Sequence, residues 1–195
     1  MRPETKEFID NWELKLSQIK NDNDQLKELY DKFTTLFTIY NRYYNEAFYQ
    51  FKEDEKLSKS RYSDFEKATT IILEFSGADS LIKSFDKNQK EIDDLWMLIE
   101  SKIFHINLID GEPCEKIDKQ LLENLKSISP EVKGKAVLSV IYNVRCNIVH
   151  GYKDFEEYQR LILEPLIKLL ESVIELLKKK FDDMNRQQKQ TEKTI

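Results

Sequence analysis

Helix-breaking residues are scarce in this chain, and this scarcity limits what it can fold into. The 195 residues include only four glycines and four prolines, whereas 34% of them are charged and 40% are hydrophobic. Gly and Pro disfavour helix interiors, but straight-chain residues such as Lys, Glu and Leu lose little rotamer freedom there. The sequence therefore predicts an all-α bundle of long helices, with an aromatic content of 11% that can fill a core.

Hydrophobic periodicity and capping residues place the expected helices. Ser129-Pro130-Glu131 is the clearest start signal, because Ser suits the N-cap, Pro the first turn and Glu the helix N-terminus. We expect helices over 3–20, 25 into the fifties, 64–77, 79–105 with a break near 86–88, 114–127, 130–150, and 154 to beyond 180. Residues 1–184 then form a single helical domain, and the tail 185–195, which lacks an apolar face, is expected to be disordered.

Several classes of protein are disfavoured. No apolar run approaches the roughly 20 residues that cross a bilayer, and the N-terminus has no signal-peptide core, so we expect a cytoplasmic protein without membrane contact. The possible soft metal ligands are Cys114, Cys146, His105 and His150, which form no paired zinc spacing. We expect no metal, no cofactor and two free thiols, and we interpret His105 as a surface or capping residue.

Charge is distributed unevenly along the chain. The net charge of −5 argues against a surface that coats nucleic acid. Yet residues 132–153 contain no acid, while Lys133, Lys135, Arg145 and Lys153 are basic. This stretch is either a chance gap in a charge-rich sequence or the wall of an anion-binding site.

The end of the helix expected over 130–150 carries Arg145, Asn147 and His150. On an ideal helix Arg145 and His150 lie roughly 140° apart, but a long guanidinium and an imidazole in the last turn can still meet at one pocket; Asn147 and His150 are about 60° apart. An imidazole can take the proton of a ribose 2′-hydroxyl, and a guanidinium can neutralise charge on phosphate oxygens. Asn147 can donate to the phosphate or orient the imidazole. The alternative is structural: these side chains cap a helix end.

The run from Ile141 to Lys153 resembles the signature of HEPN domains, in which an Arg precedes a His by four to six intervening residues. The family frequently has a polar residue directly after the Arg. Here four residues intervene, Cys146 occupies the position after Arg145, and the asparagine is displaced by one position, to Asn147. The match covers about thirteen residues, and the order of helices around it is compatible with the same family.

The resemblance implies an HEPN-like bundle and a metal-independent endoribonuclease, typically a toxin or antiphage effector restrained by an antitoxin or regulatory protein. Such enzymes form homodimers in which two motifs share one composite site. Lys153, Lys133 and Lys135 would then contact RNA phosphates and Tyr152 would stack on a base, whereas we expect Tyr142 to pack against neighbouring helices. Two alternatives stay open: a non-catalytic HEPN module for RNA binding or scaffolding, and a plain helical interaction protein.

Overall fold

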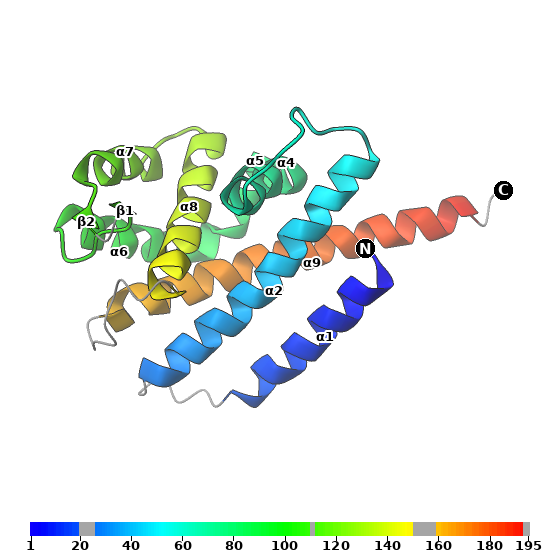
Figure 1. The fold of residues 1–195 in the computed structure, drawn as a ribbon, viewed down its shortest axis with the longest axis horizontal. Coiled ribbons are helices and arrows are strands. Elements are labelled where there is room, and N and C mark those ends of the chain that lie inside the picture. Colours follow the sequence, from blue (N-terminus) through cyan, green and yellow to red (C-terminus); the bar gives the residue numbers. More distant parts are fainter. Residues whose placement is uncertain (20–25, 110–111, 150–158, 193–195) are drawn as a thin grey trace.

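The computed structural model describes residues 1–19, 26–109, 112–149 and 159–192, and most of them are helical (Figure 1). This confirms the predicted all-α class. The elements are α1 Pro3–Gln18, α2 Leu26–Glu53, α3 Asp64–Glu66, the π-helical turn η1 Lys67–Ile71, α4 Ile72–Ser76, α5 Ala78–Ser84, the 3₁₀ turn η2 Asp86–Asn88, α6 Gln89–Glu100, β1 Leu108–Ile109, β2 Glu112–Pro113, α7 Glu115–Leu125, α8 Pro130–Val149 and α9 Arg160–Glu192.

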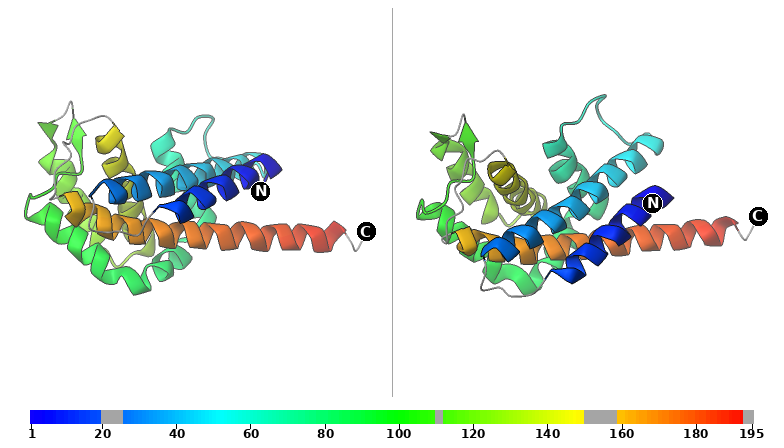
Figure 2. Two further views of the ribbon diagram at one scale, coloured as in Figure 1. Left: turned by 90° about the horizontal axis from the view of Figure 1, so that it is seen from below. Right: turned by 60° about the horizontal axis from the view of Figure 1, so that its bottom comes forward.

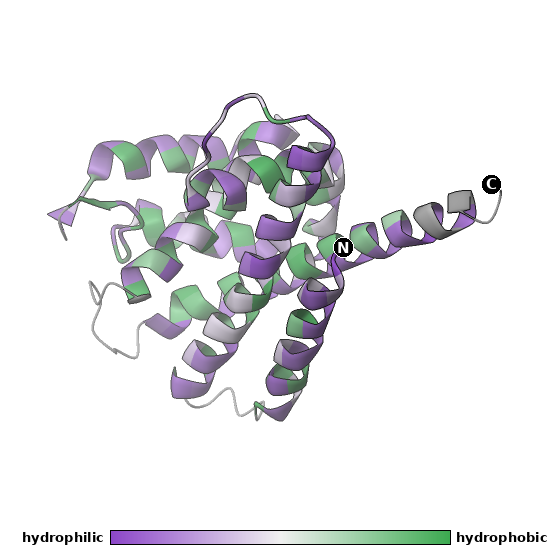
Figure 3. Cartoon of the chain, turned by 45° about the vertical axis from the view of Figure 1, so that its right-hand side comes forward, coloured by the Kyte–Doolittle hydropathy of each residue, from purple (hydrophilic) through white to green (hydrophobic). Residues whose placement is uncertain are grey.

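The bundle is organised around α9, the longest helix (Figures 1 and 2). α2 packs along it and α1 covers α2, while α6 packs on another side of α9 and α8 lies against α5, α7 and η1. Hydrophobic bands alternate with hydrophilic ones along the helices in Figure 3, as burial of one face requires. The apolar residues along one face of α9, here called its seam, are all buried: Leu163, Leu166, Leu170, Ile174 and Leu177.

Capping residues mark helix starts and ends in the structure, and the predicted start at Ser129 is confirmed. Ser129 Oγ accepts a hydrogen bond from the Val132 N–H at 3.4 Å, directly before α8. Ser63 and Glu66 form a reciprocal capping box at α3. Gly77 ends α4 with a φ of 82°, a backbone conformation that residues with a Cβ atom rarely adopt.

The prediction for α6 is wrong at its C-terminal end. The helix stops at Glu100 rather than His105, and Lys102 follows with a φ of 57°. Ile103, which the predicted helix would have included, is 54% exposed, whereas Phe104 and Ile106 are buried. Local hydrogen bonds close the helix end: the Lys102 N–H donates to the Ile99 carbonyl at 3.1 Å and the Phe104 N–H to the Leu98 carbonyl at 3.2 Å. Beyond it, the Asp118 carboxylate on α7 accepts from the Asn107 N–H at 2.9 Å.

α9 continues to Glu192, so the helix extends into the segment 185–195 that we expected to be disordered. Arg, Gln, Lys and Glu fill this segment and favour helix even where nothing covers them. Arg186 also pairs with Asp183 at 3.6 Å, one turn earlier. Residues 193–195 and the predicted start of this helix near Asp154 lie outside the described ranges.

Within the described ranges, no helix combines the length and the hydropathy needed to pass through a bilayer.

Candidate functional site

Arg145 lies in the last described turns of α8 and faces α2. Its Cζ atom is 5.3 Å from the centroid of the Phe37 ring, which is cation–π distance. The side chain is half-buried and lines a pocket of about 240 Å³, together with Phe33, Thr34, Phe37, Thr38, Asn41 and Ile148. No carboxylate of the described residues forms an ion pair with it, so this guanidinium keeps its hydrogen-bond donors available for an anion.

Asn41, which lines this pocket, belongs to a network of polar side chains on α2 and the neighbouring elements α3 and η1. Asn41 Nδ2 donates to the Tyr44 hydroxyl, and Asn45 Nδ2 donates to the Asn41 carbonyl and side-chain oxygens at 3.0 and 3.1 Å. Lys67, in η1, donates to Asn45 Oδ1 at 3.4 Å and to Asp64 at 3.2 Å. These bonds fix the amide groups beside Arg145, so the pocket wall is ordered without a ligand.

Two tyrosines next to Arg145 stay in the phenol form. Burial, with a smaller contribution from the nearby Asp64, raises the pKa of Tyr44 well above its ordinary value. Burial and the neighbouring Cys146 raise the pKa of Tyr142 to about 12, against the opposing charge of Arg145. Tyr142 packs edge-on against Phe65 with ring centroids 5.4 Å apart, which confirms its predicted packing role. Neither hydroxyl can serve as a base near neutral pH.

Asn147 faces away from Arg145. It is only 5% exposed, and its Nδ2 donates to the Ile106 carbonyl oxygen at 3.0 Å. Asn143, one turn earlier on the same face, donates to Asn107 Oδ1 at 2.9 Å. Positions two apart on a helix diverge by about 200°, which explains why Arg145 and Asn147 serve opposite sides of α8. The predicted grouping of Asn147 with Arg145 rested on the angle between Asn147 and His150 and did not include this divergence.

The two lysines upstream lie at the other end of α8. Lys133 and Lys135 precede Arg145 by twelve and ten positions, which corresponds to about 18 and 15 Å along the helix axis. Lys133 Nζ donates to Gln89 Oε1 at 2.9 Å, and Lys135 is exposed. The structure therefore does not bring them into the pocket beside Arg145. His150, Tyr152 and Lys153 lie outside the described residues.

The α2 side of the pocket was not predicted from the sequence. The aromatic residues of this helix suit a core, and Phe37 and Tyr40 are indeed buried. The overlooked signal is a stripe of small polar side chains on the same helix, spaced four, three and four residues apart: Thr34, Thr38, Asn41 and Asn45.

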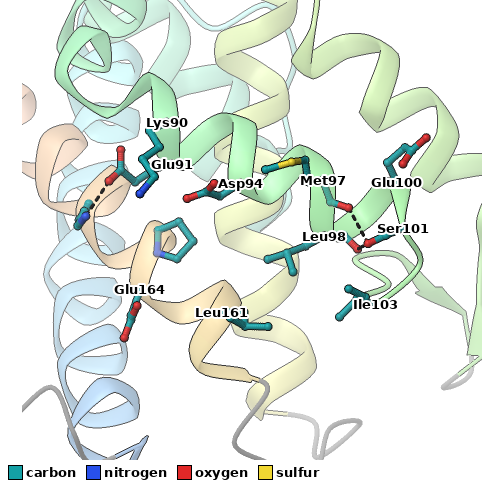
Figure 4. A pocket seen from close by; sticks show the side chains of 12 residues that line it. Lys90, Glu91, Asp94, Met97, Leu98, Glu100, Ser101, Ile103, Leu161 and Glu164 are labelled. Atoms are coloured by element: carbon teal, nitrogen blue, oxygen red, sulfur yellow. Dashed lines mark hydrogen bonds and ion pairs between the residues drawn. The ribbon is translucent and has the colours of Figure 1, made fainter.

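A larger pocket of about 580 Å³ lies between α6 and α9 (Figure 4). Met97, Ile103 and Leu161 contribute apolar surface, and each is more than half exposed. Its charged groups include an ion pair at 2.7 Å between Lys168 and Glu91. Lys90 also lines this pocket and forms no ion pair with another described residue, but none of the motif residues singled out in the sequence lies here. Among the described residues, no cluster of three or more His, Cys, Asp or Glu side chains is arranged to hold a metal ion.

Comparisons with protein-family models, with curated proteins and with solved structures found no match to this chain.

Proposed function

We propose that this protein is a metal-independent endoribonuclease of the HEPN type, which cleaves cellular or phage RNA as a toxin or antiphage effector. The observation that carries the proposal is the guanidinium of Arg145, which has no ion-pair partner among the described residues and lies over Phe37 in a pocket near the end of α8. His150 follows the last described residue of that helix directly in the chain. A free cation and a titratable imidazole, brought together at one phosphate, are the groups that RNA cleavage needs.

In the proposed reaction the nucleophile is the RNA's own 2′-hydroxyl, which attacks the adjacent phosphorus atom. The His150 imidazole takes the proton of a ribose 2′-hydroxyl, and the 2′ oxygen forms a bond to phosphorus. The bond from phosphorus to the 5′ oxygen breaks, and this oxygen receives a proton from an imidazolium, supplied in a homodimer by the second copy of the motif. Arg145 compensates the charge that grows on the phosphate oxygens. The products are a 2′,3′-cyclic phosphate and a 5′-hydroxyl.

The test measures cleavage of end-labelled RNA in EDTA. We expect Arg145→Ala and His150→Ala each to reduce the rate by about 100-fold or more, the usual effect of losing an electrostatic stabiliser or a base. Arg186→Ala is the matched control, because it removes an exposed arginine from the far end of α9. An oligonucleotide with a 2′-deoxy residue at the cleavage position should resist cutting. Cleavage at the wild-type rate by the double variant Arg145→Ala/His150→Ala would refute the assignment.

A second candidate is a non-catalytic HEPN module that binds RNA or serves as a protein scaffold. The observation that favours it is the hydrogen bond from the buried Asn147 amide to the Ile106 carbonyl. Because this amide is already occupied, Asn147, a polar residue of the motif, has no role in catalysis. RNA that binds the wild-type protein but stays intact over long incubation would support this alternative.

A further inference from the structure

A second histidine site lies on the opposite side of α8, and it uses none of the residues of the proposed ribonuclease site. His105 follows the end of α6, and its Nδ1 lies 3.2 Å from Oδ2 of Asp118 on α7. The Asp118 side chain is only 6% exposed and that of His105 is 21% exposed. A buried carboxylate therefore orients an imidazole whose ring reaches the surface.

The orientation of this pair is fixed by a chain of hydrogen bonds. Asp118 Oδ1 accepts from both the backbone N–H and the Nδ2 of Asn107, at 2.9 and 2.8 Å. Asn107 Oδ1 in turn accepts from Asn143 on α8 at 2.9 Å. Because a carboxylate can only accept, His105 Nδ1 carries the proton of this contact and Nε2 is the nitrogen left for a ligand. Within the described residues, Nε2 has no hydrogen-bond partner.

His105 and Asp118 line a pocket of about 440 Å³ between α6 and α7, a volume typical of small-molecule sites. Ile99 and Leu122 supply apolar wall, while Lys116 and Lys119 lie three positions apart on α7 and therefore share a face. Neither lysine forms an ion pair with another described residue.

The charges of this pocket favour an anion when His105 is protonated. Lys102 pairs with Glu115 at 2.8 Å, and a protonated His105 pairs with Asp118 at 3.2 Å. The charges that remain are then the two ammonium groups of Lys116 and Lys119 and the carboxylate of Glu100, whereas with a neutral His105 the Asp118 charge makes the lining neutral overall.

We propose that this pocket binds a small phosphate monoester of mononucleotide size, through the ammonium groups of Lys116 and Lys119 and the Nε2 atom of His105. A protonated imidazole donates to a phosphate oxygen, and a neutral one accepts from a phosphate hydroxyl, so His105 can contribute in either form. The apolar wall of Ile99 and Leu122 contacts the organic part of the ligand.

The test uses NMR of the two histidine rings in the full chain, with adenosine 5′-monophosphate, inorganic phosphate and adenosine as probes. The His105 signal is identified by its loss in His105→Gln. We expect both phosphate-bearing probes to shift this signal with dissociation constants of about 1 mM or below, and adenosine to leave it unchanged. An equal shift by adenosine, or no shift by the monophosphate, would overturn the proposal.

A pair of matched variants separates specific binding from general charge. Lys116→Gln/Lys119→Gln should weaken binding of the monophosphate about fivefold or more, because charge-assisted hydrogen bonds are lost. Lys87→Gln/Lys179→Gln changes the net charge equally, but these lysines line a different pocket. Equal weakening by the two double variants would show a nonspecific charge effect and refute the site.

Discussion

At the scale of single residues, neighbouring positions on α8 perform different tasks. Arg145 points to an open pocket on α2, whereas Asn147 is buried against the segment that follows α6. The asparagine satisfies the Ile106 carbonyl, which would otherwise lack a donor in the interior. We therefore assign Asn147 to the stability of the fold rather than to contact with RNA.

This assignment predicts the behaviour of Asn147→Ala. The variant should lose about 1–3 kcal/mol of unfolding free energy, the usual cost of leaving a buried carbonyl without a donor. Below its unfolding temperature it should retain RNA cleavage within a few-fold of wild type. Denaturant unfolding and initial cleavage rates, measured on one preparation, provide the check. A loss of activity as large as that of Arg145→Ala, at unchanged stability, would restore a catalytic role for Asn147.

The sequence predicts part of the candidate site. Arg145 stands out because its spacing to His150 is local, and local spacing can be seen in a sequence. The contributions of Phe37 and Asn41 depend on α2 packing beside α8, across about a hundred residues of chain, and no local pattern encodes that contact. His105 was given no site role for the same reason, since its partner Asp118 belongs to another helix.

At the scale of elements, a buried carboxylate on α2 holds the start of α1. Glu46 is 4% exposed, and its carboxylate accepts from the Arg2 N–H at 2.6 Å, from Arg2 Nε at 2.9 Å and from the Thr5 hydroxyl at 2.8 Å. Burial alone would raise the pKa of Glu46, but these hydrogen bonds and the charge of Arg2 outweigh it and lower the pKa below its ordinary value of 4.5.

The lowered pKa has a defined consequence for stability. A carboxyl group with a depressed pKa in the folded state stabilises the fold fully above its unfolded pKa, and this contribution disappears as the pH falls through the folded pKa. Glu46→Gln should therefore cost about 1–3 kcal/mol at pH 7 and progressively less below about pH 4. Thermal unfolding of both proteins between pH 7 and pH 3 measures the difference. A gap that stays constant over this range would contradict the role of the charge.

Most helices could be predicted because their signals are local. The cap at Ser129, the capping box at Ser63 and the glycine at Gly77 each act within one helical turn. The π-helical turn η1 could not be predicted from local signals; within it the Ala68 carbonyl accepts from the Tyr40 hydroxyl of α2, a contact between distant parts of the chain. The early end of α6 at Glu100 is marked by no glycine or proline, because Lys102 takes the positive φ there.

At the scale of the whole molecule, the proposed homodimer brings two copies of the motif to one shared site. The wild-type site then has two imidazoles, one to remove a proton and one to return a proton. A single imidazole can do both in turn, because it becomes an imidazolium when it takes the 2′-hydroxyl proton. A mixture of variants tests this arrangement directly, because a heterodimer of Arg145→Ala with His150→Ala keeps one guanidinium and one imidazole.

We expect each variant alone to be inactive and their equimolar mixture, after subunit exchange, to regain measurable cleavage. About half of the dimers in such a mixture are heterodimers on statistical grounds, which sets the upper limit of the recovery. Differently tagged copies verify that exchange has occurred, and light scattering verifies the dimer. Exchange without any recovery would argue against a composite site.

The protection of backbone amide hydrogens from exchange with solvent should change along α9. Its seam from Leu163 to Leu177 is buried, and Phe181 stacks on Phe75 with ring centroids 4.7 Å apart. Asn185 Oδ1 still accepts from the Met1 amino group at 3.1 Å, but the C-terminal end of the helix projects beyond the rest of the bundle (Figures 1 and 2). Amide hydrogens in the projecting turns can exchange by fraying from the end, whereas those in the seam exchange only when the bundle opens. Deuterium uptake would thus divide one continuous helix into a long slow part and a short fast end.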